Sequence, residues 1–427
     1  MRSFFLPLGL AALCIQPISV VAQTYVSDIP PAQPQPFHGQ LPQLKQLTLA
    51  AALQRALQQS PDLRIAARDI EIADGGIVQA GARPNLELAL LAEGLQKENR
   101  TTTLQLSQVL ETGGKRPARM LAARRGYDVA VADQSSRRAE VRAAVTTAFF
   151  DVLVTQQRLQ LAQAALQLSQ QAAGAAAKRV AAGKISPVEE TRARVAVAGS
   201  AMELDQAMAE LDLARQRLAA SWGSRTVDFA ELAGPDTSVA VDQQAAAPLG
   251  SLAGSPQLAQ ARLEIDLQHA QLAMERSRRV PDLTLSLGAK RDEQAGLSQT
   301  VIGLSMPLPL LDSNRGNVLV ASRKLDKARD ELVALENRLA LELAIAARQR
   351  QRAEADLRAL RSDILPGAQS AYDAAIRGFE LGKFSFLDVL DAQRTLLQHK
   401  SHYLRSLAEF YRAQADIGRL TGLDQIL

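Results

Sequence analysis

Cysteine, histidine and aromatic residues are scarce in this chain of 427 residues. One cysteine and four histidines exclude a disulfide framework, a zinc site built on cysteines and an iron–sulfur cluster held by this chain alone. Only 4% of the residues are aromatic although 47% are hydrophobic, because alanine and leucine, mixed with Gln, Arg and Glu, dominate the sequence. This composition is typical of long packed helices.

Excess charge and long hydrophobic runs are also missing. The 49 basic and 45 acidic residues leave a formal net charge of +4, which indicates neither a nucleic-acid partner nor a disordered acidic chain. Beyond the N-terminal region, no stretch reaches the roughly 18 apolar residues of a membrane-spanning helix. GxSxG, HExxH, P-loop and dinucleotide-binding patterns are absent, so the sequence predicts neither an enzyme nor a cofactor.

Residues 1–22 have the parts of a secretory signal peptide. A positively charged start, an apolar run and a small-residue exit at Val20-Val21-Ala22 follow one another. We therefore expect export, with a mature chain that begins near Gln23. Lipidation at Cys14 is the alternative, but a lipoprotein signal needs a small residue where Leu13 stands.

The chain contains an internal duplication. Its two halves share Pro, Gly-Lys and Ser landmarks, which indicates one unit that was copied. Four pairs of segments align at offsets of 195 to 199 residues: SPDLRIAARDIEI from Ser60 with SPQLAQARLEIDL from Ser255, RPNLEL from Arg83 with VPDLTL from Val280, LQLSQVLETGGKR from Leu104 with IGLSMPLPLLDSNR from Ile302, and AAGKISPVEE from Ala181 with ELGKFSFLDV from Glu380. The repeats span 47–223 and 255–422; a proline-rich strap (23–46), a linker (224–254) and a tail (423–427) complete the chain.

Each repeat begins with a helix and a hairpin. The helices, expected at 49–82 and 256–279, end where proline forbids their continuation. Two alternating segments joined by a polar loop follow in each repeat, and they predict β-hairpins at 85–110 and 282–308. Each segment is long enough for a tilted strand to cross a bilayer. Four strands cannot close a barrel and lipid does not tolerate an open edge, so the chain must oligomerise, although sequence alone does not choose the number of copies.

A long helix and a return helix complete each repeat. The long helices, expected at 115–182 and 315–381, carry apolar residues at coiled-coil spacing, and the second should kink at Pro366. Both end in a Gly-Lys-x-Ser tip, at 183–186 and 382–385. Glycine suits a left-handed C-cap and serine suits the N-cap of the helix that returns.

This arrangement resembles the TolC family of outer-membrane efflux factors. GKFSFLDVLDAQRTL from Gly382 looks like the family's second periplasmic tip, and GKISPVEETRARV from Gly183 looks like the first. The resemblance covers residues 47–427. It implies a mainly α fold with transmembrane β, in which a duplicated protomer gives four strands to a trimeric, twelve-stranded β-barrel that a long α-helical coiled-coil tunnel continues into the periplasm. The expected location is the outer membrane of a Gram-negative bacterium.

The resemblance also implies partners and site residues. In the family the tips contact a periplasmic adaptor protein (a membrane fusion protein), and an inner-membrane RND-type transporter supplies the energy. Asp388 and Asp391 match two aspartates that ring the closed periplasmic gate, although Asp388 also suits a simple helix cap. Phe379 and Phe384 replace a Tyr and an Arg that restrain the gate in some members. The adaptor-contact role is carried to Gly183, Lys184, Ser186, Gly382, Lys383 and Ser385.

The cargo follows from one further motif. LETGGKR from Leu110 is similar to the ELGGKR pattern of CzcC-like components of heavy-metal efflux systems, which implies cations such as zinc, cobalt, cadmium or nickel. Gly113-Gly114 also suits a turn where the barrel joins the helix. His399 and His402 lie at i and i+3 without a carboxylate partner, so no metal site is predicted. A duct for drugs or for type I protein secretion, and a periplasmic coiled-coil adaptor, are the alternative functions.

Overall fold

The computed structural model describes residues 44–94, 96, 99–233 and 251–422. The predicted signal peptide, the tail, nearly all of the strap and much of the linker lie outside these residues. Within these ranges, no helix combines the length and the apolar character needed to span a membrane.

The first helix of repeat one is divided, contrary to the single helix predicted over 49–82. α1 (Leu49–Gln59) ends at Ser60, whose φ of −56° and ψ of 127° leave the helical region, and α2 (Pro61–Gly81) begins with Pro61. Proline is tolerated at a first helical position because no hydrogen bond within the helix needs a backbone N–H there. The equivalent helix of repeat two, α6 (Pro256–Ser277), begins with proline in the same way.

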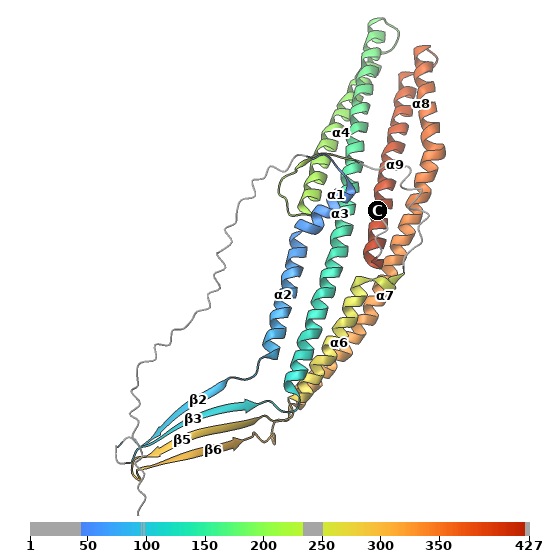
Figure 1. The fold of residues 1–427 in the computed structure, drawn as a ribbon. Coiled ribbons are helices and arrows are strands. Elements are labelled where there is room, and N and C mark those ends of the chain that lie inside the picture. Colours follow the sequence, from blue (N-terminus) through green and yellow to red (C-terminus); the bar gives the residue numbers. More distant parts are fainter. Residues whose placement is uncertain (1–43, 95, 97–98, 234–250, 423–427) are drawn as a thin grey trace, which may run out of the picture. The chain divides into compact units, whose positions relative to one another are not determined.

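Four strands form one antiparallel sheet in the order β2-β3-β5-β6 (Figure 1). These strands are β2 (Leu86–Glu93), β3 (Thr101–Leu110), β5 (Leu283–Asp292) and β6 (Leu297–Ser305), and they confirm both predicted hairpins. The polar loop of the second hairpin is short, because β5 continues to Asp292 and β6 begins at Leu297. β3 pairs with β5 over ten residues, so the sheet joins the two repeats.

Long helices pack side by side beyond the sheet (Figure 1). Repeat one contributes α3 (Lys115–Ala181) and α4 (Pro187–Ala220), and repeat two contributes α7 (Arg315–Ala359), α8 (Leu365–Glu380) and α9 (Phe386–Thr421). A π-helical turn (Leu360–Ile364) separates α7 from α8. The interruption predicted at Pro366 is therefore a π turn just before the proline. Proline has no backbone N–H, so the regular helical hydrogen-bond pattern cannot continue through it, and the wider π turn accommodates this break.

The core lies where α1, α3, α4 and α9 meet. Phe150 and Tyr411 stack there, with ring centroids 3.4 Å apart and planes 4° from parallel. Burial raises the pKa of Tyr411 to about 12. Two short strands flank this core: β1 (Leu44–Leu47) pairs in parallel with β4 (Phe229–Leu232), so the described ends of the strap and the linker pair with each other.

Candidate functional site

The two predicted tips have the same backbone turn. Gly183 and Gly382 adopt φ of 69° and 72°, the left-handed conformation that favours glycine. The next residue in each tip donates its N–H to the carbonyl five residues earlier: Lys184 to Arg179 and Lys383 to Gly378, both at 2.8 Å. Gly183, Lys184, Ser186, Gly382, Lys383 and Ser385 are all exposed, so both tips are available for contact.

Ser385 and Asp388 form a complete capping box at the start of α9. The Asp388 carboxylate accepts hydrogen bonds from the Ser385 hydroxyl at 2.7 Å and from the Ser385 N–H at 2.8 Å. The hydroxyl bond, followed by the backbone bond, lowers the pKa of Asp388 below 3.8. Asp388 therefore carries a negative charge at neutral pH while it caps the helix.

Asp391 lies one turn further along α9 and is exposed, as Asp388 is. Residues three apart share one helical face, so both carboxylates lie on the same side of α9. The first tip differs, because Ser186 caps α4 through the Val188 N–H at 3.3 Å whereas Glu189 pairs with Arg192 at 3.0 Å. Both serines are therefore N-caps, as predicted, but only the second tip has a complete capping box.

An arginine joins the two tips. The guanidinium carbon of Arg179, near the end of α3, lies 3.8 Å from the ring centroid of Phe379 on α8. The same guanidinium donates through Nη2 to the Phe379 carbonyl at 2.8 Å. Arg179 thus binds both the ring and the backbone of a residue 200 positions later, at the helix C-terminus where a cation is favoured. Sequence reasoning missed this residue because no local pattern marks it.

The second tip has glycine where the first has Arg179. In the aligned turns Gly378 corresponds to Arg179, and a Cβ at Gly378 would come within 2.1 Å of the Phe384 ring. Phe384 therefore packs over the backbone of its own hairpin. The two phenylalanines therefore make different contacts: Phe379 receives the arginine, whereas Phe384 covers a glycine.

A small apolar cluster holds the four helices together near the tips. Each of α3, α4, α8 and α9 contributes at least one buried side chain to it: Ala176, Ala193, Tyr372, Ala375, Phe379, Val389 and Leu396. Alanines predominate on α3 and α4, which lets the helices approach closely. The cluster and the Arg179 contact both hold the α3–α4 hairpin against the α8–α9 hairpin.

The two histidines on α9 lie away from this contact in the sequence and show no ligand set. His399 is partly buried and His402 is exposed. Among the described residues, no three His, Cys, Asp or Glu side chains gather as metal ligands.

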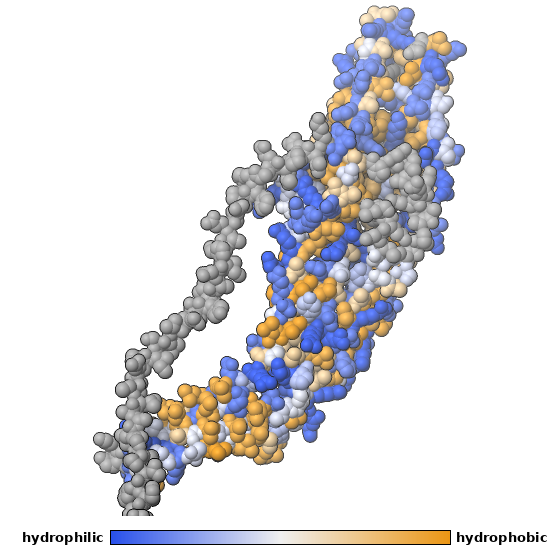
Figure 2. All heavy atoms as spheres, in the orientation of Figure 1, coloured by the Kyte–Doolittle hydropathy of each residue, from blue (hydrophilic) through white to orange (hydrophobic). Residues whose placement is uncertain are grey.

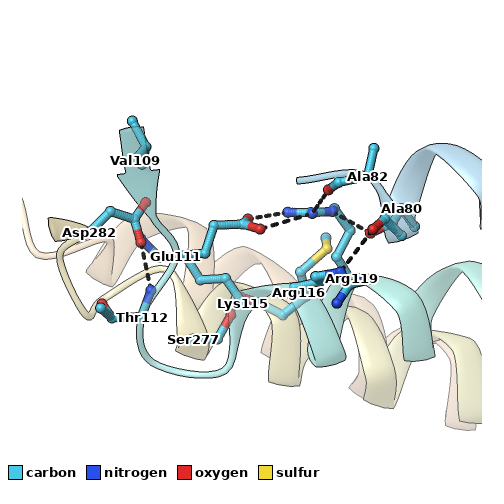
Figure 3. A network of polar contacts seen from close by, with 12 residues as sticks. Ala80, Ala82, Val109, Glu111, Thr112, Lys115, Arg116, Arg119, Ser277 and Asp282 are labelled. Atoms are coloured by element: carbon cyan, nitrogen blue, oxygen red, sulfur yellow. Dashed lines mark hydrogen bonds and ion pairs between the residues drawn. The ribbon is translucent and has the colours of Figure 1, made fainter. Parts of the chain in front are cut away.

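The LETGGKR motif lies where the sheet meets the helices (Figure 3). The Glu111 carboxylate binds Arg119 through two nitrogens, at 2.5 and 3.2 Å, and this hydrogen bond raises the pKa of Arg119. Arg119 also donates to the carbonyls of Ala80 and Ala82, both at 2.9 Å, at the end of α2. The motif thus ties the start of α3 to the end of α2.

The same motif contacts the start of β5. Asp282 accepts from the Thr112 N–H at 3.0 Å and pairs with Lys115 at 2.7 Å (Figure 3). Gly113 has a φ of 63°, and a Cβ there would lie 2.5 Å from the Val280 Cβ. The predicted glycine turn is therefore present, and its flanking charges, for which we predicted no structural role, fasten it to both repeats.

Apolar side chains are exposed along the strands. Figure 2 shows hydrophobic residues gathered over the sheet. The large ones include Leu86, Leu88, Leu90, Leu106, Leu287, Ile302 and Leu304. Such a surface needs a cover of lipid or protein.

Comparison with known proteins places these features in one family. The family model described as "Outer membrane efflux protein" matches residues 52–224 and 250–423. The chain is 43% identical over 423 residues to the cobalt-zinc-cadmium resistance protein CzcC of Cupriavidus metallidurans, and the match covers 99% of this chain and 100% of that protein. It is 28% identical to the nickel-cobalt-cadmium resistance protein NccC of Alcaligenes xylosoxydans xylosoxydans, with 69% and 68% covered.

Solved structures share the fold. A crystal structure of CusC superposes with a TM-score of 0.75 at 19% identity, covering 87% of this chain and 91% of that one. VceC of Vibrio cholerae gives a TM-score of 0.72 at 21% identity, covering 88% and 96%.

Proposed function

The chain belongs to the outer membrane efflux protein family, and on that basis we propose that it forms the outer-membrane channel of a tripartite system that exports divalent heavy-metal cations. The observation that carries the proposal is the full-length similarity to a protein named for cobalt, zinc and cadmium resistance. The family consists of transport proteins, which agrees with the lack of catalytic motifs in the sequence.

Three copies would place their strands in one closed sheet of twelve. Closure would remove the free edges of β2 and β6, which lipid cannot satisfy. The exposed leucines of the strands would then face the acyl chains, and the long helices would continue the duct into the periplasm. This homotrimer would be the part of the assembly that is built from copies of this chain alone.

The exposed tips are the surface that a periplasmic adaptor would contact. Gly183, Lys184 and Ser186 in one hairpin and Gly382, Lys383 and Ser385 in the other share one turn, so an adaptor hairpin would meet two similar sites on each protomer. The sequence contains no P-loop motif, so energy would come from a partner, which we take to be an inner-membrane RND-type transporter.

Asp388 and Asp391 would form the gate. In a trimer they would supply six carboxylates around the entrance, a ring that attracts and retains cations. Arg179 would restrain this gate, because it fixes α8 to α3 beside the turn that leads into α9. Replacing both aspartates with alanine should abolish block by divalent and trivalent cations in a planar bilayer; unchanged block would remove the gate assignment.

A growth panel on a deletion strain tests the cargo. The strain is exposed to zinc, cobalt, cadmium, nickel and copper salts, and in parallel to dyes, detergents and antibiotics. The expected result is that the deletion strain is sensitive to the metal salts alone and that the returned gene restores resistance. Sensitivity to organic compounds alone would retain the channel but assign it to drug efflux, and a defect in polypeptide export alone would assign it to secretion.

A further inference from the structure

A cavity of about 440 Å³ lies between α1 and α3 of repeat one and α9 of repeat two. Its lining positions recur every three or four residues along α1 and α3, from Ala50 to Gln58 and from Ser135 to Thr146. This is the spacing of one helical face. The cavity therefore runs along the helices, beside the core in which α1, α3 and α9 meet.

The lining combines apolar and basic side chains. Leu53 and Leu57 of α1 and Ala139 of α3 line the cavity and are only partly buried. Arg138 and Arg142 line it from α3, and no carboxylate does so among the described residues. An occupant that carries apolar side chains and one negative charge would match this lining.

The described chain ends at the same cavity. Gly422, its last residue, is part of the lining. The sequence continues with the tail, Leu-Asp-Gln-Ile-Leu (423–427), in which three of five residues are large and apolar and Asp424 is acidic. Five extended residues reach at most about 17 Å. The lined face of α1 is only about 12 Å long, so the tail is long enough to span it.

The turn at Gly422 ends α9 at the edge of the cavity. Gly422 has a φ of 72°, and its N–H donates to the Gly418 carbonyl at 2.9 Å, which closes α9 with a left-handed cap. A Cβ at Gly422 would lie 2.6 Å from the Gly254 carbonyl oxygen and 3.3 Å from Pro256 Cδ. Gly418 and Pro256 both line the cavity, so the chain leaves α9 against the cavity wall.

Repeat one shows how a segment after such a glycine is fastened. The aligned glycine, Gly223, has a φ of 79° and lies in the same way against a proline that starts a helix, Pro61. Further along, Asp228 pairs with Arg55 of α1, and the next residue, Phe229, is buried in the core. An acid–arginine pair and a buried apolar side chain thus hold the chain that follows the first glycine.

We propose that the tail occupies this cavity, with its apolar side chains on α1 and Asp424 beside the arginines of α3. The tail would then clasp the last helix of repeat two to α1 and α3 of repeat one. The linker matches the lining less well, because Val239, Val241 and Leu249 are the only large apolar residues among 234–250. This clasp belongs to the single protomer and does not depend on what the channel carries.

Cysteine cross-linking in the full chain tests the placement of the tail. Cys14 is the only cysteine and lies in the predicted signal peptide, so an introduced pair reports alone. Ile426→Cys is combined with Ala139→Cys, on the cavity lining, or with the matched control Ala144→Cys. Ala144 lies on the same helix outside the lining and is the more exposed of the two alanines. A short bis-maleimide is applied to outer membranes, and linked peptides are measured by mass spectrometry.

The pair with Ala139→Cys should give at least fivefold more linked peptide within one chain than the pair with Ala144→Cys. Equal or higher yield in the control overturns the inference. A higher yield for Val241→Cys with Ala139→Cys would assign the cavity to the linker instead. Linked dimers on a denaturing gel would assign it to the tail of a neighbouring copy, and either result overturns the clasp.

The charge of Asp424 gives a second measurement. In the chain that carries Ile426→Cys and Ala139→Cys, Asp424→Lys should lower the cross-linking yield at least threefold, because lysine would face the two arginines of α3. Asp424→Glu keeps the charge and should preserve the yield. Equal yields in the two variants, at equal amounts of protein in the membrane, would exclude the contact between Asp424 and the arginines.

Discussion

Replacing Arg179 with alanine should loosen the two hairpin tips of each protomer. The substitution removes a guanidinium 3.8 Å from the Phe379 ring and a hydrogen bond of 2.8 Å to the Phe379 carbonyl. Arg179 is partly exposed, so the lower end of each contribution applies. The ring contact is worth about 1 kcal/mol and the charged hydrogen bond about 1.5 kcal/mol. Their sum, about 2.5 kcal/mol, corresponds to roughly a 70-fold shift toward separated tips.

Conductance in planar bilayers measures this shift. Wild-type trimers should conduct little, and Arg179→Ala trimers should show larger or longer openings and admit large hydrophilic antibiotics in growth assays. Lys178→Ala is the matched control because it removes an exposed neighbouring charge on the same helix. The conductance of Arg179→Lys should lie between those of wild type and Arg179→Ala, since lysine keeps the charge but lacks the planar group that stacks on the ring. Equal conductance of Arg179→Ala and wild type, at equal trimer content, would refute the restraint.

Three further outcomes follow from particular contacts. Gly113→Ala should destabilise the protein by about 2–4 kcal/mol, because alanine is strained in the left-handed conformation and its Cβ would clash with Val280. Gly114→Ala should cost only about 1–2 kcal/mol, because Gly114 is also left-handed (φ 72°) but has open space around it. Equal thermal stability of the two variants would contradict the contact with Val280. Tyr411→Phe should be neutral or stabilising by about 1 kcal/mol, because the buried Tyr411 hydroxyl has no hydrogen-bond partner among the described residues; a clear loss of stability in denaturant titration would disprove this. Ser385→Ala should loosen the first turn of α9 by about 1 kcal/mol and return the pKa of Asp388 toward 3.8, which hydrogen exchange and its pH dependence can follow. Because the pKa of Asp388 in the folded protein lies below its ordinary value, the cap is present above the ordinary aspartate pKa and is lost as the pH falls through the lowered value. Hydrogen exchange in the variant that matches wild type at neutral pH would count against the cap.

Much of the fold was accessible from local pattern. The alternation of Leu86 and Leu88 predicted a strand, and the glycines at 183 and 382 predicted turns that the structure confirms. The break at Ser60 was missed although Pro61 signals it, because a proline at a first helical position is compatible with either one helix or two. The π turn before Pro366 was also missed, since sequence indicates a kink without its form.

The contacts of the candidate site likewise fall into two classes: local contacts, which spacing in the sequence can indicate, and contacts between distant residues, which it cannot. The capping box at Ser385 and Asp388 is a contact over three residues, and the sequence predicted both residues as caps although not their mutual hydrogen bonds. The partner of Arg179 lies 200 residues away, and Arg119 reaches carbonyls 37 to 39 residues earlier. No periodicity identifies either arginine among the many on these helices.

By itself, the sequence of this protein determined its elements, their order, the duplication and the turns between them, because hydrophobic period, proline and glycine act on neighbouring residues. Only the tertiary structure decided which side chains meet across the hairpins, such as Arg179 with Phe379 and Lys115 with Asp282. The physical reason is that such pairs depend on how each long helix is rotated and advanced along its neighbours. Packing of the whole core sets that rotation, and a few side chains cannot.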